Sequence, residues 1–327
     1  MRAFDYMRAT SVDDAIAALS DPGTRCLAGG TNLVDLMKGY VEQPTRLVDI
    51  TRLPLRAIES LPDGGLRIGA LVSNTDLAND RTVRERYPLL SQALVAGASP
   101  QLRNMATVGG NLLQRTRCHY FTDVGFDACN KRKPGSGCAA LEGPNRIHAI
   151  LGVSEQCIAV NPSDMSVALA ALDALVEARS SAGARQIAMK EFHRLPGDHP
   201  ERDTELRHDE LITGVILPRS PFAAHSRYLK VRDRASYEFA LVSVAAALDM
   251  DANRVRDVRI ALGGVAPRPW RAADAEQLLI GRSLDDAVLA AAALAATQGA
   301  HPRRDNAFKV TLAQRAIVRA LREAVLT

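Results

Sequence analysis

The chain has 327 residues, of which 47% are hydrophobic and 24% are charged, and its formal net charge is +4. This length is enough for two domains with ordinary cores. A nucleic-acid-binding protein would need a larger and more clustered positive charge, and the one tight basic run, residues 131–133, has no aromatic residues between its cations. No apolar stretch approaches the roughly 20 residues of a membrane span. We therefore expect a globular protein with neither nucleic acid as a partner nor a membrane span.

The first half of the chain is expected to mix short helices and strands. Ser11, with Asp14 three residues later, predicts a capped helix over 11–19. Strands are predicted at 25–28, 46–50 and 66–72, and helices at 32–38 and 88–98. Residues 99–157 show little sustained periodicity, which predicts a long loop held by something other than a core. A loop of this length is unusual unless it is functional.

Regular structure is expected to resume after this loop. A strand is predicted at 157–160, a helix at 164–172, and strands near 174–179, 185–189 and 210–217. The sequence Pro-Arg-Ser-Pro at 218–221 indicates a domain boundary. Beyond it we expect strands at 225–232, 239–250 and 255–265, then helices at 271–280, 284–297 and 311–325. Strands followed by helices, without βαβ alternation, predict an α+β domain.

Two glycine pairs carry the clearest binding signal. The first lies in Cys26-Leu27-Ala28-Gly29-Gly30-Thr31-Asn32-Leu33, and the second in Thr107-Val108-Gly109-Gly110-Asn111. Glycine lets the backbone approach a phosphate closely, and the amides that follow can point outward from a helix N-terminus. Either loop alone also fits a simple turn between a strand and a helix. Together they suggest two amide nests that serve one diphosphate.

These two loops resemble those of the FAD-binding subunits of the xanthine dehydrogenase and molybdenum hydroxylase family. The resemblance continues in Asn161-Pro162-Ser163-Asp164, in the segment 209–218, which contains Ile212, and in Leu229-Lys230 before the apolar segment 241–245. It implies that both glycine loops, Asp164, Ile212 and Lys230 contact FAD. It also implies an α+β fold of the vanillyl-alcohol oxidase type, with two FAD-binding subdomains over 1–218 and a C-terminal α+β domain of the CO dehydrogenase flavoprotein type over 222–327.

Four of the five cysteines lie close together in the sequence: Cys118, Cys129, Cys138 and Cys157. They fall in an insertion at about 115–158 that the usual member of the family lacks. Their gaps of 10, 8 and 18 residues do not match the C-x-x-C spacing of ferredoxins or zinc ribbons. Disulfides, structural zinc and a 4Fe–4S cluster all remain possible on spacing alone. A core-supported protein has little need of disulfides, which favours a metal.

The insertion resembles that of the flavin subunit of periplasmic aldehyde oxidoreductase, which carries a 4Fe–4S cluster here. The resemblance implies that these four cysteines ligate the cluster, and that Cys26 packs beside the first glycine loop. His119 and His148 could replace a thiolate, although hydrogen-bonded loop histidines are the simpler reading. Tyr237 and Glu238 could either lie near the flavin ring or form a turn before the next strand.

The resemblance further implies a role in electron transfer. A large subunit with the molybdenum cofactor and a small 2Fe–2S subunit would complete a heterotrimer, and electrons from an aldehyde would pass through FAD to an external acceptor. The alternatives are a xanthine or hydroxybenzoyl-CoA type subunit, and a zinc-stapled nucleotide-binding regulatory protein. Residues 1–19 do not have the pattern of a signal peptide. We therefore expect a periplasmic location as the passenger of a signal-bearing partner, with the cytoplasm as the alternative.

Overall fold

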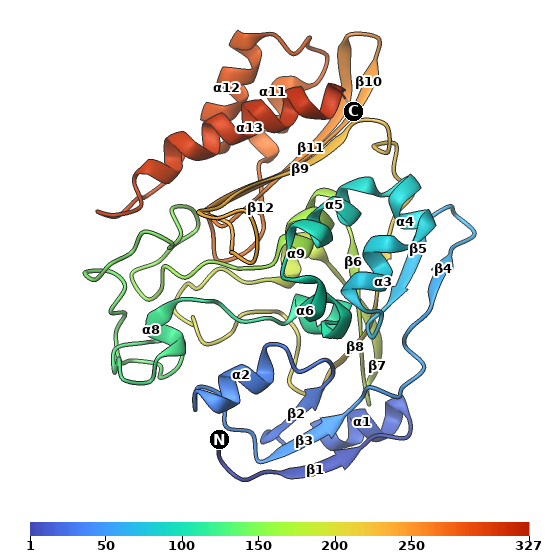
Figure 1. Ribbon diagram of the computed structural model, residues 1–327, viewed down its shortest axis with the longest axis vertical. Coiled ribbons are helices and arrows are strands. Elements are labelled where there is room, and N and C mark those ends of the chain that lie inside the picture. Colours follow the sequence, from blue (N-terminus) through green and yellow to red (C-terminus); the bar gives the residue numbers. More distant parts are fainter. Residues whose placement is uncertain (327) are drawn as a thin grey trace.

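The first sheet of the computed structural model, which describes residues 1–326, is three-stranded and parallel (Figure 1). In spatial order its strands are β1 (Asp5–Arg8), β3 (Arg46–Asp49) and β2 (Thr24–Leu27). Helix α1 (Val12–Leu19) begins with the predicted capping box, in which the Asp14 N–H donates to Ser11 Oγ over 3.0 Å. Helix α2 (Leu33–Lys38) follows β2. The predictions for α1, β2, α2 and β3 are confirmed, whereas the mostly exposed edge strand β1 has no apolar pattern that would predict it.

The second sheet is antiparallel and joins segments that are far apart in the sequence. In spatial order its strands are β4 (Ile58–Ser60), β5 (Leu66–Gly69), β8 (Leu211–Leu217), β6 (Leu175–Ser180) and β7 (Gly183–Ala188). The helices of this region are α3 (Asn74–Asn79), α4 (Arg81–Arg86), α5 (Pro88–Ala96), α6 (Pro100–Met105), α7 (Val108–Leu112), α9 (Asp164–Ala171) and α10 (Met189–Phe192). One hydrophobic core holds residues of this sheet together with residues of α3, α5 and α9.

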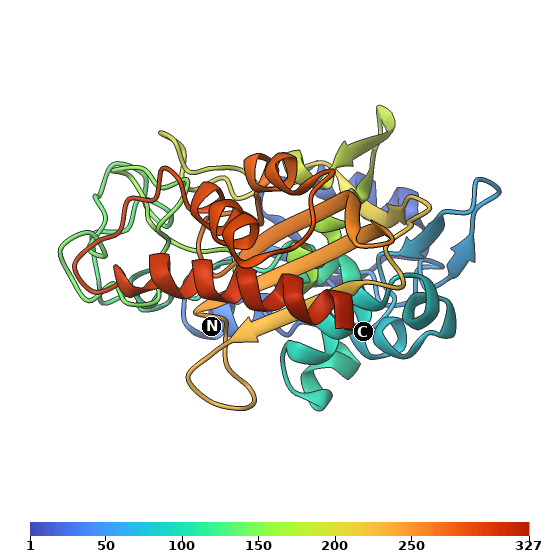
Figure 2. The same cartoon turned by 90° about the horizontal axis from the view of Figure 1, so that it is seen from above.

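The third sheet is formed by the C-terminal part of the chain. Its strands are β9 (Ser226–Val231), β10 (Val242–Asp251), β11 (Arg254–Gly263) and β12 (Trp270–Arg271). Each strand is antiparallel to its neighbours in the sheet. Three helices cover one face, as Figure 2 shows in orange and red: α11 (Ala273–Leu279), α12 (Asp286–Ala296) and α13 (Phe308–Leu326). The predicted order of strands followed by helices is confirmed.

Strand β10 is buried on both faces, which explains its unbroken apolar run. Val242, Val244, Ala246 and Leu248 pack in the core beneath α11, α12 and α13. The alternate residues Ala245 and Ala247 belong to the core of the second sheet, where helices α5 and α9 contact β9, β10 and β11. Small residues on this second face allow the helices to approach closely. The C-terminal sheet is therefore a layer between two sets of helices.

Residues 99–157 contain more ordered structure than the sequence predicts. They include helices α6, α7 and α8 (His119–Thr122). Phe121 is buried, and Ile150 and Leu151 enter the C-terminal core, where both backbone N–H groups donate to the Val265 carbonyl. The expected strand at 157–160 is not found in the described residues. The only β-pairing of this apolar segment is the isolated β-bridge between Ser154 and Cys157. The predictions of a loop without a core and of this strand were both wrong.

The α+β fold class is confirmed by the three sheets and their helix layers. None of the helices within residues 1–326 combines the length and the apolar content that crossing a membrane would require.

Candidate functional site

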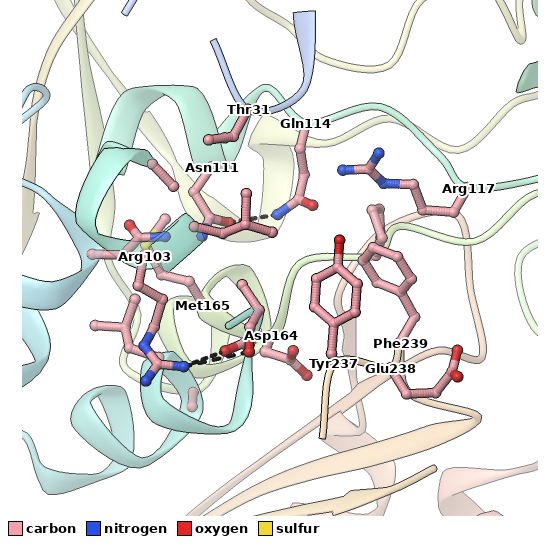
Figure 3. Close-up of a pocket in the computed structure, with 18 of the residues that line it drawn as sticks. Thr31, Arg103, Asn111, Gln114, Arg117, Asp164, Met165, Tyr237, Glu238 and Phe239 are labelled. Carbon is pink, nitrogen blue, oxygen red and sulfur yellow. Dashed lines mark hydrogen bonds between the residues drawn. The ribbon is translucent and has the colours of Figure 1, made fainter. Parts of the chain in front are cut away.

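A cleft of about 320 Å³ lies between the two glycine loops, helix α9 and the loop that joins β9 to β10 (Figure 3). Its volume falls within the range of small-molecule sites. Five predicted cofactor residues line it together: Thr31, Gly110, Asn111, Asp164 and Lys230. The other lining residues are Asp35, Asn74, Ala93, Leu94, Gly97, Ala98, Leu102, Arg103, Ala106, Gln114, Arg117, Pro162, Met165, Arg234, Tyr237, Glu238 and Phe239. The fold thus brings four separate parts of the predicted site into one cavity.

The first glycine loop runs from β2 into α2 and leaves its amides free. Gly30 has a φ of +71°, in the left-handed region that favours glycine. A Cβ at Gly29 would lie 1.8 Å from the carbonyl oxygen of Met105, so the loop packs directly against the end of α6. Within residues 1–326, no acceptor is found for the backbone N–H of residues 29–32. These amides are available to an anion in the way the sequence predicts.

The second glycine loop begins helix α7, and its amides are already used. Thr107 Oγ1 accepts the Gly110 N–H over 3.2 Å as the helix N-cap. The N–H groups of Val108 and Gly109 donate to the carbonyls of Val72 and Ala70. The interpretation of two equivalent amide nests therefore does not hold. A Cβ at Gly110 would meet only Thr107 Oγ1 within 4 Å, so this glycine instead gives a ligand close access to the backbone.

A buried ion pair lies at the edge of the cleft. Lys230 Nζ is 2.8 Å from Asp164 Oδ2, and the two side chains are only 4% and 8% exposed. The Tyr228 hydroxyl donates to Asp164 Oδ1 over 2.6 Å, and Lys230 also donates to the Ala96 carbonyl. Burial and the Asp164 charge raise the pKa of Tyr228 well above its usual value, so the hydroxyl remains a donor. This network fixes Asp164, on α9, against Lys230, on β9.

Two asparagines connect the loops to the rest of the site. Asn111 Oδ1 accepts a hydrogen bond from Gln114 Nε2 over 2.7 Å (Figure 3) and another from Ser163 Oγ over 2.6 Å. Asn32 Oδ1 accepts the Arg115 N–H over 3.0 Å. The second loop is thereby tied to α9, and the first loop is tied to the start of the cysteine-rich insertion.

The remaining predicted cofactor residues lie outside the lining of the cleft. Ile212 is buried in the core of the second sheet, so the structure does not place it with the other predicted cofactor residues. Cys26 and Ala28 pack against the core beside α1, and burial raises the pKa of the Cys26 thiol to about 12. The other predicted residues of the two loops also do not line the cleft: Leu27, Gly29, Gly30, Asn32, Leu33, Thr107, Val108 and Gly109.

Sequence reasoning missed three arginines of the cleft, Arg103, Arg117 and Arg234, and the aromatic residue Phe239. Arg103 donates to the Gly97 carbonyl over 2.7 Å, and the guanidinium of Arg117 lies 5.1 Å from the centre of the Phe239 ring. Burial lowers the pKa of Arg103 and Arg117. No motif surrounds these residues, so the sequence held no signal for them. Tyr237, with a φ of +52°, does line the cleft, which favours the reading that it approaches the ligand.

The four cysteines of the insertion converge on a second, small cavity. All four of Cys118, Cys129, Cys138 and Cys157 line it. The backbones of Cys129 and Cys138 pair as an isolated antiparallel β-bridge. Burial raises the pKa of Cys118 to about 12 and of Cys157 to about 11, and it also raises the pKa of Cys138. The insertion therefore gathers its thiols in the interior, although they are far apart in the sequence.

The chemistry of this donor set suits a soft metal, but the present positions do not define a metal site. His148 Nε2 lies 3.1 Å from Cys118 Sγ, and burial lowers the pKa of His148 to about 4, so the ring is neutral. All five cysteines are free, which leaves the disulfide interpretation without support. Across residues 1–326, no three cysteine, histidine or carboxylate side chains are close enough to share an ion as they stand. Four thiols without a carboxylate remain the set that zinc or an iron–sulfur cluster takes.

The main cleft contains polar atoms that lack a partner within the protein. They are Asn74 Oδ1 and Arg117 Nε, and Asn32 Nδ2 is a third such atom in the adjoining loop. Buried polar atoms in proteins are nearly always hydrogen-bonded. With the free amides of the first loop, they fit a polar ligand that includes an anionic group.

Comparisons with known proteins agree with this geometry. The family described as the FAD binding domain in molybdopterin dehydrogenase matches residues 2–220, and the CO dehydrogenase flavoprotein C-terminal domain matches residues 227–324. The aldehyde oxidoreductase FAD-binding subunit PaoB of Escherichia coli is 52% identical over 99% of both chains. The glyceraldehyde dehydrogenase medium chain of Sulfolobus acidocaldarius is 29% identical over 86% of this chain and 83% of its own.

Solved structures show the same relationship. A chain of quinoline 2-oxidoreductase from Pseudomonas putida superposes with a TM-score of 0.77 at 28% identity, covering 99% of this chain and 98% of its own. A chain of carbon monoxide dehydrogenase from Hydrogenophaga pseudoflava gives 0.78 at 27% identity, covering 99% and 97%. The chain belongs to the family of FAD-binding subunits of molybdenum hydroxylases.

Proposed function

We propose that this chain is the FAD-binding, electron-transferring subunit of a molybdenum-containing aldehyde oxidoreductase. The observation that carries the proposal is the cleft, which is lined by Thr31 of the first glycine loop, by Asn74 and Arg117 with their unpaired polar atoms, and by the Asp164–Lys230 pair. The 52% identity to an aldehyde oxidoreductase subunit supports an aldehyde as the substrate of the assembly. Its 29% identity to a putative xanthine dehydrogenase subunit gives weaker support to the alternative substrate class.

The chain would act as one of three subunits. A large subunit would hold the molybdenum cofactor, a small subunit would hold 2Fe–2S clusters, and electrons would leave for an external acceptor. Relatives named as medium chains or medium subunits support such an assembly. The cleft of this chain accounts for a flavin site, so oxidation of the aldehyde is assigned to the partners.

Bound FAD would supply the redox chemistry, while this chain binds and orients it. The amides of residues 29–32 would donate to the diphosphate, and Gly110 would let the ligand approach α7 closely. Lys230 would present a fixed positive charge, because Asp164 and the Ala96 carbonyl hold its ammonium group in place. Tyr237 and Phe239 would cover part of the ligand and exclude water from it.

We extend the proposal to the insertion, where Cys118, Cys129, Cys138 and Cys157 would hold one 4Fe–4S cluster. The convergence of four buried or half-buried thiols on one cavity supports a metal with four thiolate ligands. Zinc accepts the same ligands, and a zinc-stapled nucleotide-binding regulatory protein is the alternative function. Metal binding would require loss of the thiol protons and closer approach of the four sulfur atoms.

Spectroscopy and metal analysis of the anaerobically purified chain test both cofactors. We expect flavin absorption bands, a broad iron–sulfur shoulder and about four irons per chain. Cys129→Ala should lose the iron, whereas the matched control Cys26→Ala, at a cysteine remote from the cavity, should keep it. One zinc per chain without iron would contradict the cluster, and a colourless protein without flavin would contradict the proposed function.

We also propose that the chain reaches the periplasm only as the folded passenger of a signal-bearing partner. The proposal rests on the resemblance of the cysteine-rich insertion to that of a periplasmic enzyme. In fractionated cells, the chain expressed alone should be found in the cytoplasm, and co-expression with its partners should move it to the periplasm. Periplasmic recovery without any partner, or cytoplasmic retention of the full assembly, would contradict this.

A further inference from the structure

The charges that line the cleft are mostly neutralised within the protein. Four lining residues are basic and three are acidic: Arg103, Arg117, Lys230 and Arg234, against Asp35, Asp164 and Glu238. Lys230 pairs with Asp164 over 2.8 Å, and Arg234 pairs with Glu238 over 3.3 Å. Arg103 donates to three backbone carbonyls at the end of α5. Only Arg117, among the cations of the described cleft, is left without a hydrogen-bond acceptor or ion-pair partner, and the charge of the lining residue Asp35 acts on it without forming an ion pair.

The environment of Arg117 makes this isolation costly. Its Nε atom is buried without a partner, and its guanidinium contacts the face of the Phe239 ring. Arg115, two residues earlier, is also partly buried but is fully engaged, with Asp203 at 2.8 Å and with Glu42. Leaving a partly buried cation without a direct partner costs free energy, which an anionic ligand would recover.

The position of Arg117 indicates which part of a ligand it would meet. In Figure 3 its side chain extends toward Gln114, on the side of the cleft where Thr31 lies. Thr31 belongs to the first glycine loop, whose amides have no acceptor in residues 1–326. Arg117 and these amides therefore offer donors to the same region, and an arginine fork matches phosphate oxygens well.

We infer that Arg117, at the start of the cysteine-rich insertion, binds a phosphate oxygen of the FAD diphosphate. The inference rests on the proposed FAD site and adds to it a residue outside both glycine loops. Because Cys118 is the next residue, the segment that lines the cysteine cavity also supplies a cation to the flavin cleft. The insertion would thereby contribute to the FAD site as well as to the proposed metal site.

Removing the charge of Arg117 should affect FAD binding and the stability of the FAD-free chain differently. Arg117→Met should weaken FAD binding by about 10- to 100-fold, the range of one charge-assisted hydrogen bond, and should make the dissociation constant less sensitive to salt. Without FAD, the same variant should unfold at the wild-type temperature or slightly above it, because it no longer carries an unpaired, partly buried cation. A residue that only stabilised the fold would instead lower that temperature.

Two further variants and one control complete the test, with FAD binding followed by flavin fluorescence at several salt concentrations. Arg117→Lys keeps the charge and should recover most of the lost affinity, while Arg81→Met removes an exposed charge far from the cleft and should change nothing. Wild-type affinity in Arg117→Met, or an Arg117→Lys variant as weak as Arg117→Met, would overturn the inference. Failure of the wild-type chain to bind FAD would instead overturn the proposed function.

Discussion

Replacing Gly110 with valine is expected to give a folded chain that retains almost no FAD. Gly110 borders the open cleft, so a larger side chain would occupy the space that the ligand needs. We expect affinity to fall by about 100-fold or more, equivalent to about 3 kcal/mol, with little change in the unfolding temperature of the FAD-free protein. Flavin content after gel filtration and thermal unfolding measure the two effects.

Gly29 provides the matched contrast to Gly110. A Cβ at Gly29 would collide with the Met105 carbonyl oxygen, so Gly29→Ala should destabilise the fold itself by about 1 to 3 kcal/mol. Each of these glycines belongs to a Gly-Gly pair, but the two meet different neighbours. Full flavin occupancy in Gly110→Val would show that the second loop is only a turn.

Replacing Lys230 with methionine should cause the largest loss of stability. The Asp164 carboxylate would remain buried, with the Tyr228 hydroxyl as its remaining side-chain donor. Breaking a buried ion pair by removing one partner costs about 3 to 5 kcal/mol. Urea unfolding of the FAD-free chain should show this decrease, together with loss of flavin binding.

A double variant separates the ion pair from other effects. Lys230→Met combined with Asp164→Leu leaves no buried charge and should recover a large part of the lost stability. The exposed residue Lys190, changed to methionine, should alter stability by no more than about 0.5 kcal/mol. A Lys230→Met variant as stable as the wild type would mean that the pair is not buried in solution.

The FAD cleft is a joint product of both parts of the chain. The first 220 residues supply the glycine loops and Asp164, but Lys230 comes from β9, and Tyr237 and Phe239 come from the loop after it. Strand β10 shares one face with the core of the second sheet. The C-terminal sheet therefore contributes directly to the site, in addition to carrying the helices α11, α12 and α13.

The sequence predicted the elements whose burial leaves a regular pattern. Strand β10 is a long apolar segment, β11 alternates buried apolar residues with charged ones before its apolar end, and α1 begins with a capping box that is visible as Ser11 and Asp14. Short helices were missed although they had local signals. Helix α6 begins with Ser99 as its N-cap and Pro100, and α7 begins with Thr107, but each helix has too few residues for apolar periodicity to emerge.

The site was predictable only where residues carry a local motif. Thr31, Gly110, Asn111, Asp164 and Lys230 belong to recognisable segments, and the fold gathers them. Arg117 depends on long-range packing against Phe239, which no local pattern encodes. The difference between the two glycine loops also required the structure, because it depends on Ala70 and Val72 accepting the amides of α7.

The reduction of bound flavin by aldehyde, with and without the partner subunits, tests the central claim most directly. The isolated chain should contain a flavin that a chemical reductant bleaches and a quinone or acceptor dye reoxidises. Aldehyde alone should leave its spectrum unchanged, because the described cleft is accounted for by flavin. Adding the molybdenum and 2Fe–2S subunits should make flavin reduction follow addition of the aldehyde. Steady aldehyde oxidation by the single chain, or a flavin that stays oxidised in the complete assembly, would contradict the assignment of this chain as the electron-transferring subunit.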